Sequence, residues 1–176
     1  MKKLFLLSLI IAASFAYSQE KQSANFPKNE IKLNAAFLIA GAFEVSYERI
    51  IDDESAFGTS LFLNANDDIS NKFMLTPYYR YYFGRKPAAG FFAEGFGSIN
   101  TYENKIYNYL SSLSYDYRTE KTTDFALGFG LGGKWITKKG VVFEIYSGVG
   151  RNLINSDNSD FQIIGRGAIS VGYRFN

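Results

Sequence analysis

Acidic residues at alternate positions are the groups in this chain that could carry out chemistry. Glu44, Glu48 and Glu94 lie in segments where charged and apolar residues alternate. Paired carboxylates of this kind can act as a general acid and base or form a proton path. Alternatively, each carboxylate forms a structural ion pair with a basic residue of a neighbouring segment. We favour ion pairs, because a residue of opposite charge is available for each carboxylate.

The chain contains no histidine and no cysteine. It therefore lacks the usual general base of serine hydrolases, the commonest metal ligand, disulfide bonds and thiolate metal sites. The glycines of the stretch 128–133 have the spacing of a phosphate-binding loop, but no helix pattern follows them. We expect no catalytic residue, no metal, no cofactor and no nucleic-acid partner.

Alternation of apolar and polar residues is the main structural signal. In the C-terminal segment 161–175, Ile163, Ile169 and Val171 share one parity, whereas Arg166 and Arg174 share the other. Since successive side chains of a strand point to opposite faces, this pattern predicts a strand with one apolar and one charged face. Similar patterns predict eight strands, at 31–39, 43–51, 56–64, 72–83, 91–102, 123–136, 141–152 and 161–175. Pro77 cannot donate to a strand ladder, so we predict a β-bulge there.

The N-terminus has the layout of a secretory signal peptide, with Lys2 and Lys3, an apolar run, and small residues at Ala16 and Ser18. We expect cleavage after Ser18. The predicted organisation is a signal peptide (1–18), a periplasmic tail (19–29) and a barrel (30–176).

The fold class predicted is all-β: an eight-stranded antiparallel up-and-down transmembrane β-barrel in the outer membrane of a Gram-negative cell. Tilted strands of about 9–11 residues span a bilayer, and outer-membrane barrels combine short periplasmic turns with longer extracellular loops. The expected short turns are 52–55, 84–90 and 137–140, and the expected longer loops are 64–71, 103–122 and 153–160. The expected partners are outer-membrane lipid and the barrel-assembly machinery.

Charged positions are expected to face the lumen, because an ionised side chain in lipid costs about 2–4 kcal/mol at the midplane. Adjacent strands would then place Arg80 near Glu94 and Lys134 near Glu144, with Glu48 neutralising Lys32 and Arg174. An eight-stranded barrel is just wide enough to be filled by side chains, so we expect no open pore. The expected lumen charges are Lys32, Glu48, Arg80, Glu94, Lys134, Glu144 and Arg174.

The segment 103–122 is polar and rich in tyrosine. Tyrosine and serine together give contact area and adaptable hydrogen bonds, so Tyr107, Tyr109, Tyr115 and Tyr117 are candidates for binding an extracellular ligand. The alternation on both sides of residues 111–112 fits equally well with two strands that extend beyond the membrane as a hairpin.

Three stretches resemble a known family: Ile-Lys-Leu-Asn at 31–34, Phe-Glu-Val-Ser-Tyr-Glu-Arg at 43–49, and Gly-Tyr-Arg-Phe at 172–175. They are similar to small outer-membrane barrels of Bacteroidota-type bacteria that form a domain of unknown function. The overall plan is similar to OmpA-type and OmpX-type barrels. The resemblance implies a barrel over the whole mature chain and no catalytic residues. Asn176 departs from the usual aromatic C-terminus of such barrels.

Three functional hypotheses remain open. The leading one is a non-enzymatic outer-membrane barrel with a structural role or a surface-binding role through its extracellular loops. The second is an outer-membrane lipid-modifying enzyme, against which the lack of histidine argues. The third is a secreted lipocalin-like barrel that binds an apolar ligand, in which the apolar side chains would point inward.

Overall fold

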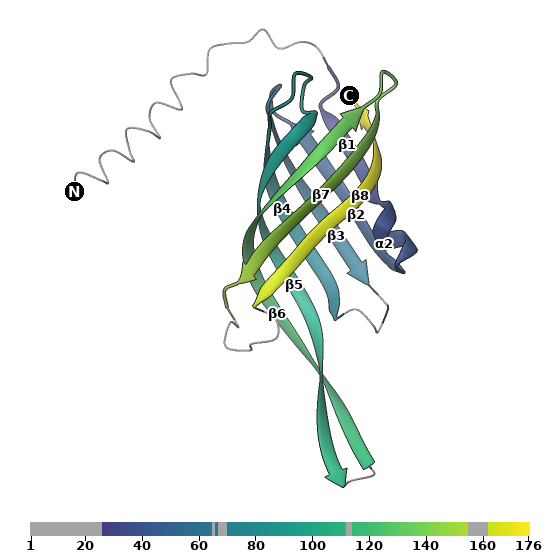
Figure 1. The fold of residues 1–176 in the computed structure, drawn as a ribbon, viewed down its shortest axis with the longest axis vertical. Coiled ribbons are helices and arrows are strands. Elements are labelled where there is room, and N and C mark those ends of the chain that lie inside the picture. Colours follow the sequence, from purple (N-terminus) through teal and green to yellow (C-terminus); the bar gives the residue numbers. More distant parts are fainter. Residues whose placement is uncertain (1–25, 65, 67–69, 112–113, 155–161) are drawn as a thin grey trace, which may run out of the picture.

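The protein forms a closed barrel of eight antiparallel strands, in which each strand pairs with the next and β8 closes on β1 (Figure 1). The computed structural model describes residues 26–64, 66, 70–111, 114–154 and 162–176. The predicted up-and-down barrel is confirmed. The predicted signal peptide (1–18) lies outside the described residues. No helix among the described residues is long and apolar enough to cross a membrane.

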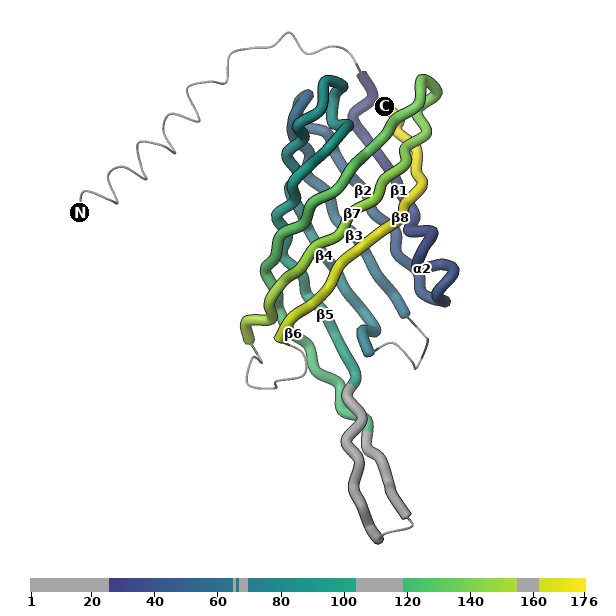
Figure 2. The backbone as a smooth tube through the Cα atoms, viewed as in Figure 1, coloured from purple at the N-terminus to yellow at the C-terminus, as the bar shows by residue number. Residues whose placement is uncertain are grey.

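Most ends of the strands lie within two residues of the predicted ones. The strands are β1 (Asn29–Asn34), β2 (Ala42–Ile50), β3 (Ser55–Asn64), β4 (Asn71–Tyr82), β5 (Gly90–Ser111), β6 (Ser114–Ile136), β7 (Val141–Asn152) and β8 (Ile163–Phe175). Three short turns, the start of β1 and the C-terminus lie at one end of the barrel, here called the short-turn end (Figure 2). The other end, from which β5 and β6 project, is the hairpin end.

Strands β5 and β6 are longer than predicted, because their pairing continues to Ser111 and Ser114. The backbone therefore agrees with the hairpin interpretation of this segment. The side chains of residues 104–118, which include Tyr107, Tyr109, Tyr115 and Tyr117, lie outside the described residues.

Large and small residues face each other across the strands that surround the lumen. Phe92 is opposite Gly132, and Phe96 is opposite Gly128. A Cβ atom added to Gly128 would lie 2.3 Å from Cζ of Phe96, and one added to Gly132 would lie 2.5 Å from Cζ of Phe92. These glycines leave the space that the phenylalanine rings occupy, so the interior is filled at this level.

The first strand is shorter than predicted. Strand β1 ends at Asn34, and residues predicted as strand form the helix α2 (Ala35–Ile39). The Asn34 side chain accepts a hydrogen bond from the backbone N–H of Phe37 at 3.4 Å and so caps the helix. Gly41, with φ of +79°, then allows the tight return into β2. A short helix capped by Asn34 therefore takes the place of the second half of the predicted strand.

The predicted β-bulge at Pro77 is wrong. The register of β4 against β5 is the same on both sides of the proline, at Leu75 with Ile99 and at Tyr78 with Phe96. The irregularity lies between Asn71 and Phe73 instead. On the lumen side, the hydroxyls of Thr76 and Ser98 form a hydrogen bond of 2.8 Å across the same two strands. The ladder therefore tolerates one missing N–H donor without inserting a residue.

Candidate functional site

The lumen contains a connected network of buried ion pairs. Carboxylates and basic side chains contribute equally among the described members, and each residue is at most 7% exposed. The members are Glu30, Glu44, Glu48, Glu94 and Glu144 with Lys32, Arg80, Lys134, Arg166 and Arg174. The formal charges of these ten residues cancel, so the network has no net charge.

Glu48 lies at the centre of this network. Its carboxylate accepts hydrogen bonds from Nζ of Lys32 at 2.8 Å and Nη1 of Arg80 at 2.9 Å. Both of these bonds are to Oε2. The other oxygen, Oε1, accepts from the hydroxyl of Tyr82 at 2.7 Å and from Nζ of Lys134. Full coordination of this kind compensates a buried carboxylate for the loss of water.

Arg80 connects the strands on opposite sides of the lumen. Its Nε donates to Glu94 at 2.8 Å, and its Nη1 donates to Glu144 at 2.6 Å as well as to Glu48. The guanidinium carbon lies 4.3 Å from the ring centroid of Phe92 and 4.5 Å from that of Tyr78. Aromatic faces and carboxylates therefore hold this cation together.

The network also closes the short-turn end of the barrel. Arg174 donates to Glu30 at 2.7 Å and to the backbone carbonyls of Pro87 and Ala88, both at 2.8 Å. The same Glu30 carboxylate accepts a hydrogen bond of 2.7 Å from Lys134. The turn between β4 and β5 is thereby tied to the interior, where Ala88 is fully buried.

The seven charges expected in the lumen from the sequence are all buried there, but only some meet the expected partner. Arg80 contacts Glu94, as expected. Lys134 forms a long ion pair of 4.0 Å with the expected Glu144, which is opposite it on β7, and its hydrogen bonds are to Glu30 and Glu48.

Arg174 contacts Glu30 and not the expected Glu48. Side chains reach across a narrow lumen, so the nearest strand does not decide the partner.

Sequence reasoning missed Glu30 and Arg166 as members of the network. Glu30 directly precedes the predicted first strand, but it continues the alternating pattern of Lys32. Arg166 has the inward parity of strand β8, and its Nη2 donates to Ser60 at 3.0 Å. Extending the alternation before residue 31 would have identified Glu30, whereas Arg166 already lies on the charged face of the predicted strand 161–175.

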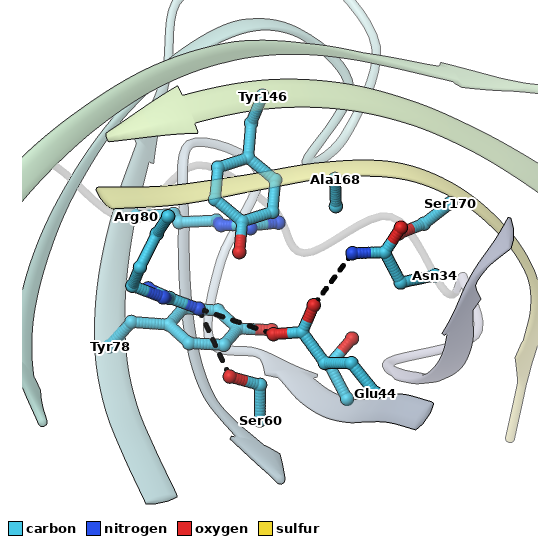
Figure 3. Close-up of a pocket in the computed structure, with 10 residues that line it drawn as sticks. Asn34, Glu44, Ser60, Tyr78, Arg80, Tyr146, Ala168 and Ser170 are labelled. Atoms are coloured by element: carbon cyan, nitrogen blue, oxygen red, sulfur yellow. Dashed lines mark hydrogen bonds and ion pairs between the residues drawn. The ribbon is translucent and has the colours of Figure 1, made fainter. Parts of the chain in front are cut away.

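Glu44, which we considered as an acid or base, has fewer partners than Glu48. It accepts a hydrogen bond of 2.7 Å from Asn34 and lies 3.9 Å from Nη2 of Arg166. Figure 3 shows Asn34 turned toward Glu44, at a gap of about 10 Å³ that also borders Tyr78 and Tyr146. A gap of this size has room for about one water molecule. Within the described residues, no group of histidine, cysteine or acidic side chains is arranged to hold a metal ion.

The outer surface of the barrel has the opposite character. Large apolar side chains on every strand are exposed, from Ile31 on β1 to Phe175 on β8. Near the short-turn end the exposed residues are mainly aromatic, and they include Tyr79, Tyr81, Phe83, Trp135 and Tyr173. The described barrel therefore presents an apolar exterior and an ionic interior.

No protein-family model matches the chain, and no curated protein matches it. Among solved structures, the chain is similar to the N-terminal β-barrel domain of Pseudomonas aeruginosa OprF, with a TM-score of 0.48 and 16% sequence identity. The match covers 85% of this chain and 98% of that domain. Membership in a Bacteroidota-type family stays a prediction.

Proposed function

We propose that the protein is a non-enzymatic outer-membrane β-barrel with a structural or surface-binding role. The main support for this proposal is that apolar side chains are exposed on all eight strands. Monomeric soluble proteins rarely expose so large a continuous apolar surface, whereas lipid solvates it. A lipocalin-like barrel would have the opposite arrangement, with apolar residues around an internal ligand.

The connections support an orientation with the short-turn end in the periplasm. The links β2–β3, β4–β5 and β6–β7 are short, and the paired extension of β5 and β6 projects from the opposite end (Figure 1). Outer-membrane barrels have short periplasmic turns and longer extracellular loops. Exposed aromatic residues near the short turns fit the headgroup region of the inner leaflet.

The contacts of the lumen carboxylates favour a structural role over catalysis. Each carboxylate of the network has a basic side chain within 4.0 Å, and a general base needs a free or weakly bound oxygen near its substrate. The same network fills the lumen at the level of Glu48, so ions are not expected to pass. We propose that any ligand contact uses the extracellular hairpin, with Tyr107, Tyr109, Tyr115 and Tyr117 as candidate residues.

Cell fractionation and a heat-modifiability gel test the location. The protein is expected in the outer-membrane fraction, with an electrophoretic shift after boiling, because an intact barrel resists detergent at room temperature. Recovery as a soluble periplasmic protein without a shift would contradict the proposal.

Two leucines of similar exposure provide a sharper test. Leu131, 52% exposed, lies midway along the part of β6 that pairs with β7, and Leu153, 49% exposed, lies just beyond β7. Leu131→Arg is expected to cost about 2–4 kcal/mol in a bilayer, whereas Leu153→Arg should cost at most about 1 kcal/mol. Urea unfolding in lipid vesicles measures both values. In a soluble barrel, both substitutions would be tolerated equally.

A further inference from the structure

The barrel wall is incomplete near the hairpin end, between β2 and β8. Strand β1 last pairs with β2 at Leu33 and Val45, and with β8 at Asn34 and Ser170. The preceding part of β8, from Ile163 to Ile169, pairs with β7 but has no β1 partner. Beyond the end of β1, the facing edges of β2 and β8 are therefore not joined by a strand ladder. We call this gap the β2–β8 seam.

A side chain and a five-residue helix close the seam. Nδ2 of Asn34 donates to the carbonyl oxygen of Gly167 on β8 at 3.1 Å and to Glu44 on β2 at 2.7 Å. Helix α2 lies beside β8 and β2 at this position (Figure 1). Phe37 packs on Phe62 at a centroid distance of 5.0 Å. A ladder of backbone hydrogen bonds would close the wall far more firmly than these few contacts.

A cavity of about 200 Å³ lies behind helix α2. This volume is that of roughly six or seven water molecules. The cavity adjoins both edges of the seam, since Glu44 of β2 and Gly165 and Gly167 of β8 line it together with Phe37 of α2. The other lining residues are Phe62, Asn71, Met74, Thr76 and Arg166. The walls therefore combine aromatic and aliphatic surface with one carboxylate and one guanidinium.

The charged residues around the cavity indicate which kind of ligand it can bind. Arg166 is already bound to Glu94 and Ser60. The Glu44 carboxylate, by contrast, accepts from the neutral side chains of Asn34 and Ser60 and has its nearest cation, Arg166, at 3.9 Å. Glu44 can therefore accept a further hydrogen bond from a hydroxyl or amide group. Because the lumen network is formally neutral, a charged headgroup would add an uncompensated buried charge. An uncharged donor group with an apolar chain fits these conditions.

We propose that the seam and its cavity form a binding site for an uncharged single-chain amphiphile that enters from the bilayer. Its hydroxyl group donates to Glu44, and its chain packs on Phe37, Phe62 and Met74. The remainder of the chain passes beneath helix α2 into the lipid, where Leu38 and Ile39 are exposed. This inference rests on the proposed location of the barrel in a membrane.

Photolabelling with a long-chain alcohol tests the site. The full mature chain is inserted into phosphatidylcholine vesicles, labelled with a diazirine derivative of dodecanol, and digested for mass spectrometry. Label is expected in the peptides that contain Phe37 and Gly165. Unlabelled dodecanol should compete about tenfold better than dodecanoate or dodecylammonium, since only the uncharged group keeps the hydrogen bond without an added charge.

Two outward-facing glycines provide a matched pair of variants. A Cβ atom at Gly165, beside the seam, or at Gly95, on the intact part of the wall, would meet no other atom within 4 Å. Gly165→Trp is expected to obstruct the seam and abolish the specific label, whereas Gly95→Trp should keep it. Met74→Trp, which fills the cavity from within, should also abolish it.

Three results would overturn the inference. They are uniform labelling of the outer surface, equal competition by the three dodecyl compounds, and unchanged labelling of Gly165→Trp and Met74→Trp. The heat-modifiability shift separates this result from failure of the proposed function. A barrel that inserts and shifts but takes up no specific label contradicts only the binding site. A chain that does not insert contradicts the membrane location itself.

Discussion

Glu44 and Glu48 lie four residues apart on the same face of β2, yet their surroundings differ. Glu48 is opposite Glu30 of β1 and is contacted by three cations and two tyrosine hydroxyls. Glu44 lies beyond the last β1 pair and borders a cavity. The difference shows that closure of the wall and filling of the lumen go together. Where β1 is present the interior is dense and ionic, and where β1 ends a cavity of about 200 Å³ lies beside a cluster of apolar side chains.

In the half that β1 closes, small residues also accommodate large ones. Gly58 is opposite Tyr78, and Gly172 is opposite Lys32. A Cβ atom at either glycine would come within 2.6 Å of the facing side chain. On the seam, Gly165 has no such restriction. Side chains therefore fill the short-turn half tightly, whereas free space remains at the seam.

The largest expected effect comes from removing the charge of Glu48, and the matching change at Glu44 serves as the comparison. Glu48→Gln leaves Lys32, Arg80 and Lys134 without their shared carboxylate and should lower the free energy of unfolding by about 3–5 kcal/mol. Glu44→Gln keeps the contact with Asn34 possible and should cost about 1 kcal/mol. Urea unfolding in detergent measures both variants. Equal losses would mean that the two halves of the lumen do not differ in this way.

Double-mutant cycles compare a buried pair with an exposed one at similar distance. Arg80 and Glu94 are 2.8 Å apart and buried, whereas Lys121, 71% exposed, lies 3.0 Å from Glu103. The coupling energy should reach about 3 kcal/mol for the buried pair and stay below about 1 kcal/mol for the exposed pair. Each cycle uses neutral substitutions. The buried pair is changed by Arg80→Met and Glu94→Gln, and the exposed pair by Lys121→Met and Glu103→Gln. Strict additivity at the buried pair would show that these side chains do not meet.

Overpacking should distinguish the filled lumen from the seam. A Cβ atom at Gly128 would lie 2.3 Å from the Phe96 ring and 2.5 Å from the carbonyl oxygen of Val149. Gly128→Ala is expected to cost about 1–3 kcal/mol, whereas Gly165→Ala should change stability by less than about 0.5 kcal/mol. Thermal or urea unfolding of the two variants tests this order, and a stable Gly128→Ala variant would argue against the packing of Phe96.

The smallest expected effect is local and concerns the closure of the seam. Asn34→Ala removes the cap of helix α2 and the hydrogen bonds to Gly167 and Glu44. A loss of about 1–2 kcal/mol is expected. Hydrogen exchange should quicken near Ile163–Ile169 but not in β7 or near Glu48. A uniform increase over the whole barrel would indicate that Asn34 contributes only to global stability.

Much of this architecture follows from sequence alone, because strand alternation is a local property. The ends of β7 agree with the alternating pattern at both residues, and the parity of β5 and β6 identifies the inward phenylalanines and the glycines opposite them. The absence of histidine and cysteine also follows directly from the sequence. The pairing of Arg80 with Glu94 could be anticipated because their Cα atoms are direct neighbours across β4 and β5.

The partners of the lumen charges and the position of the seam depend on tertiary contacts. Lys134 bonds to Glu30 and Glu48 because β1 and β2 place these carboxylates side by side, across the lumen from β6. The alternating pattern of residues 31–39 continues past Asn34, but the Asn34 cap and the turn at Gly41 give a helix there. Alternation determines the face of each residue, whereas partners and gaps depend on how eight strands close around a narrow interior.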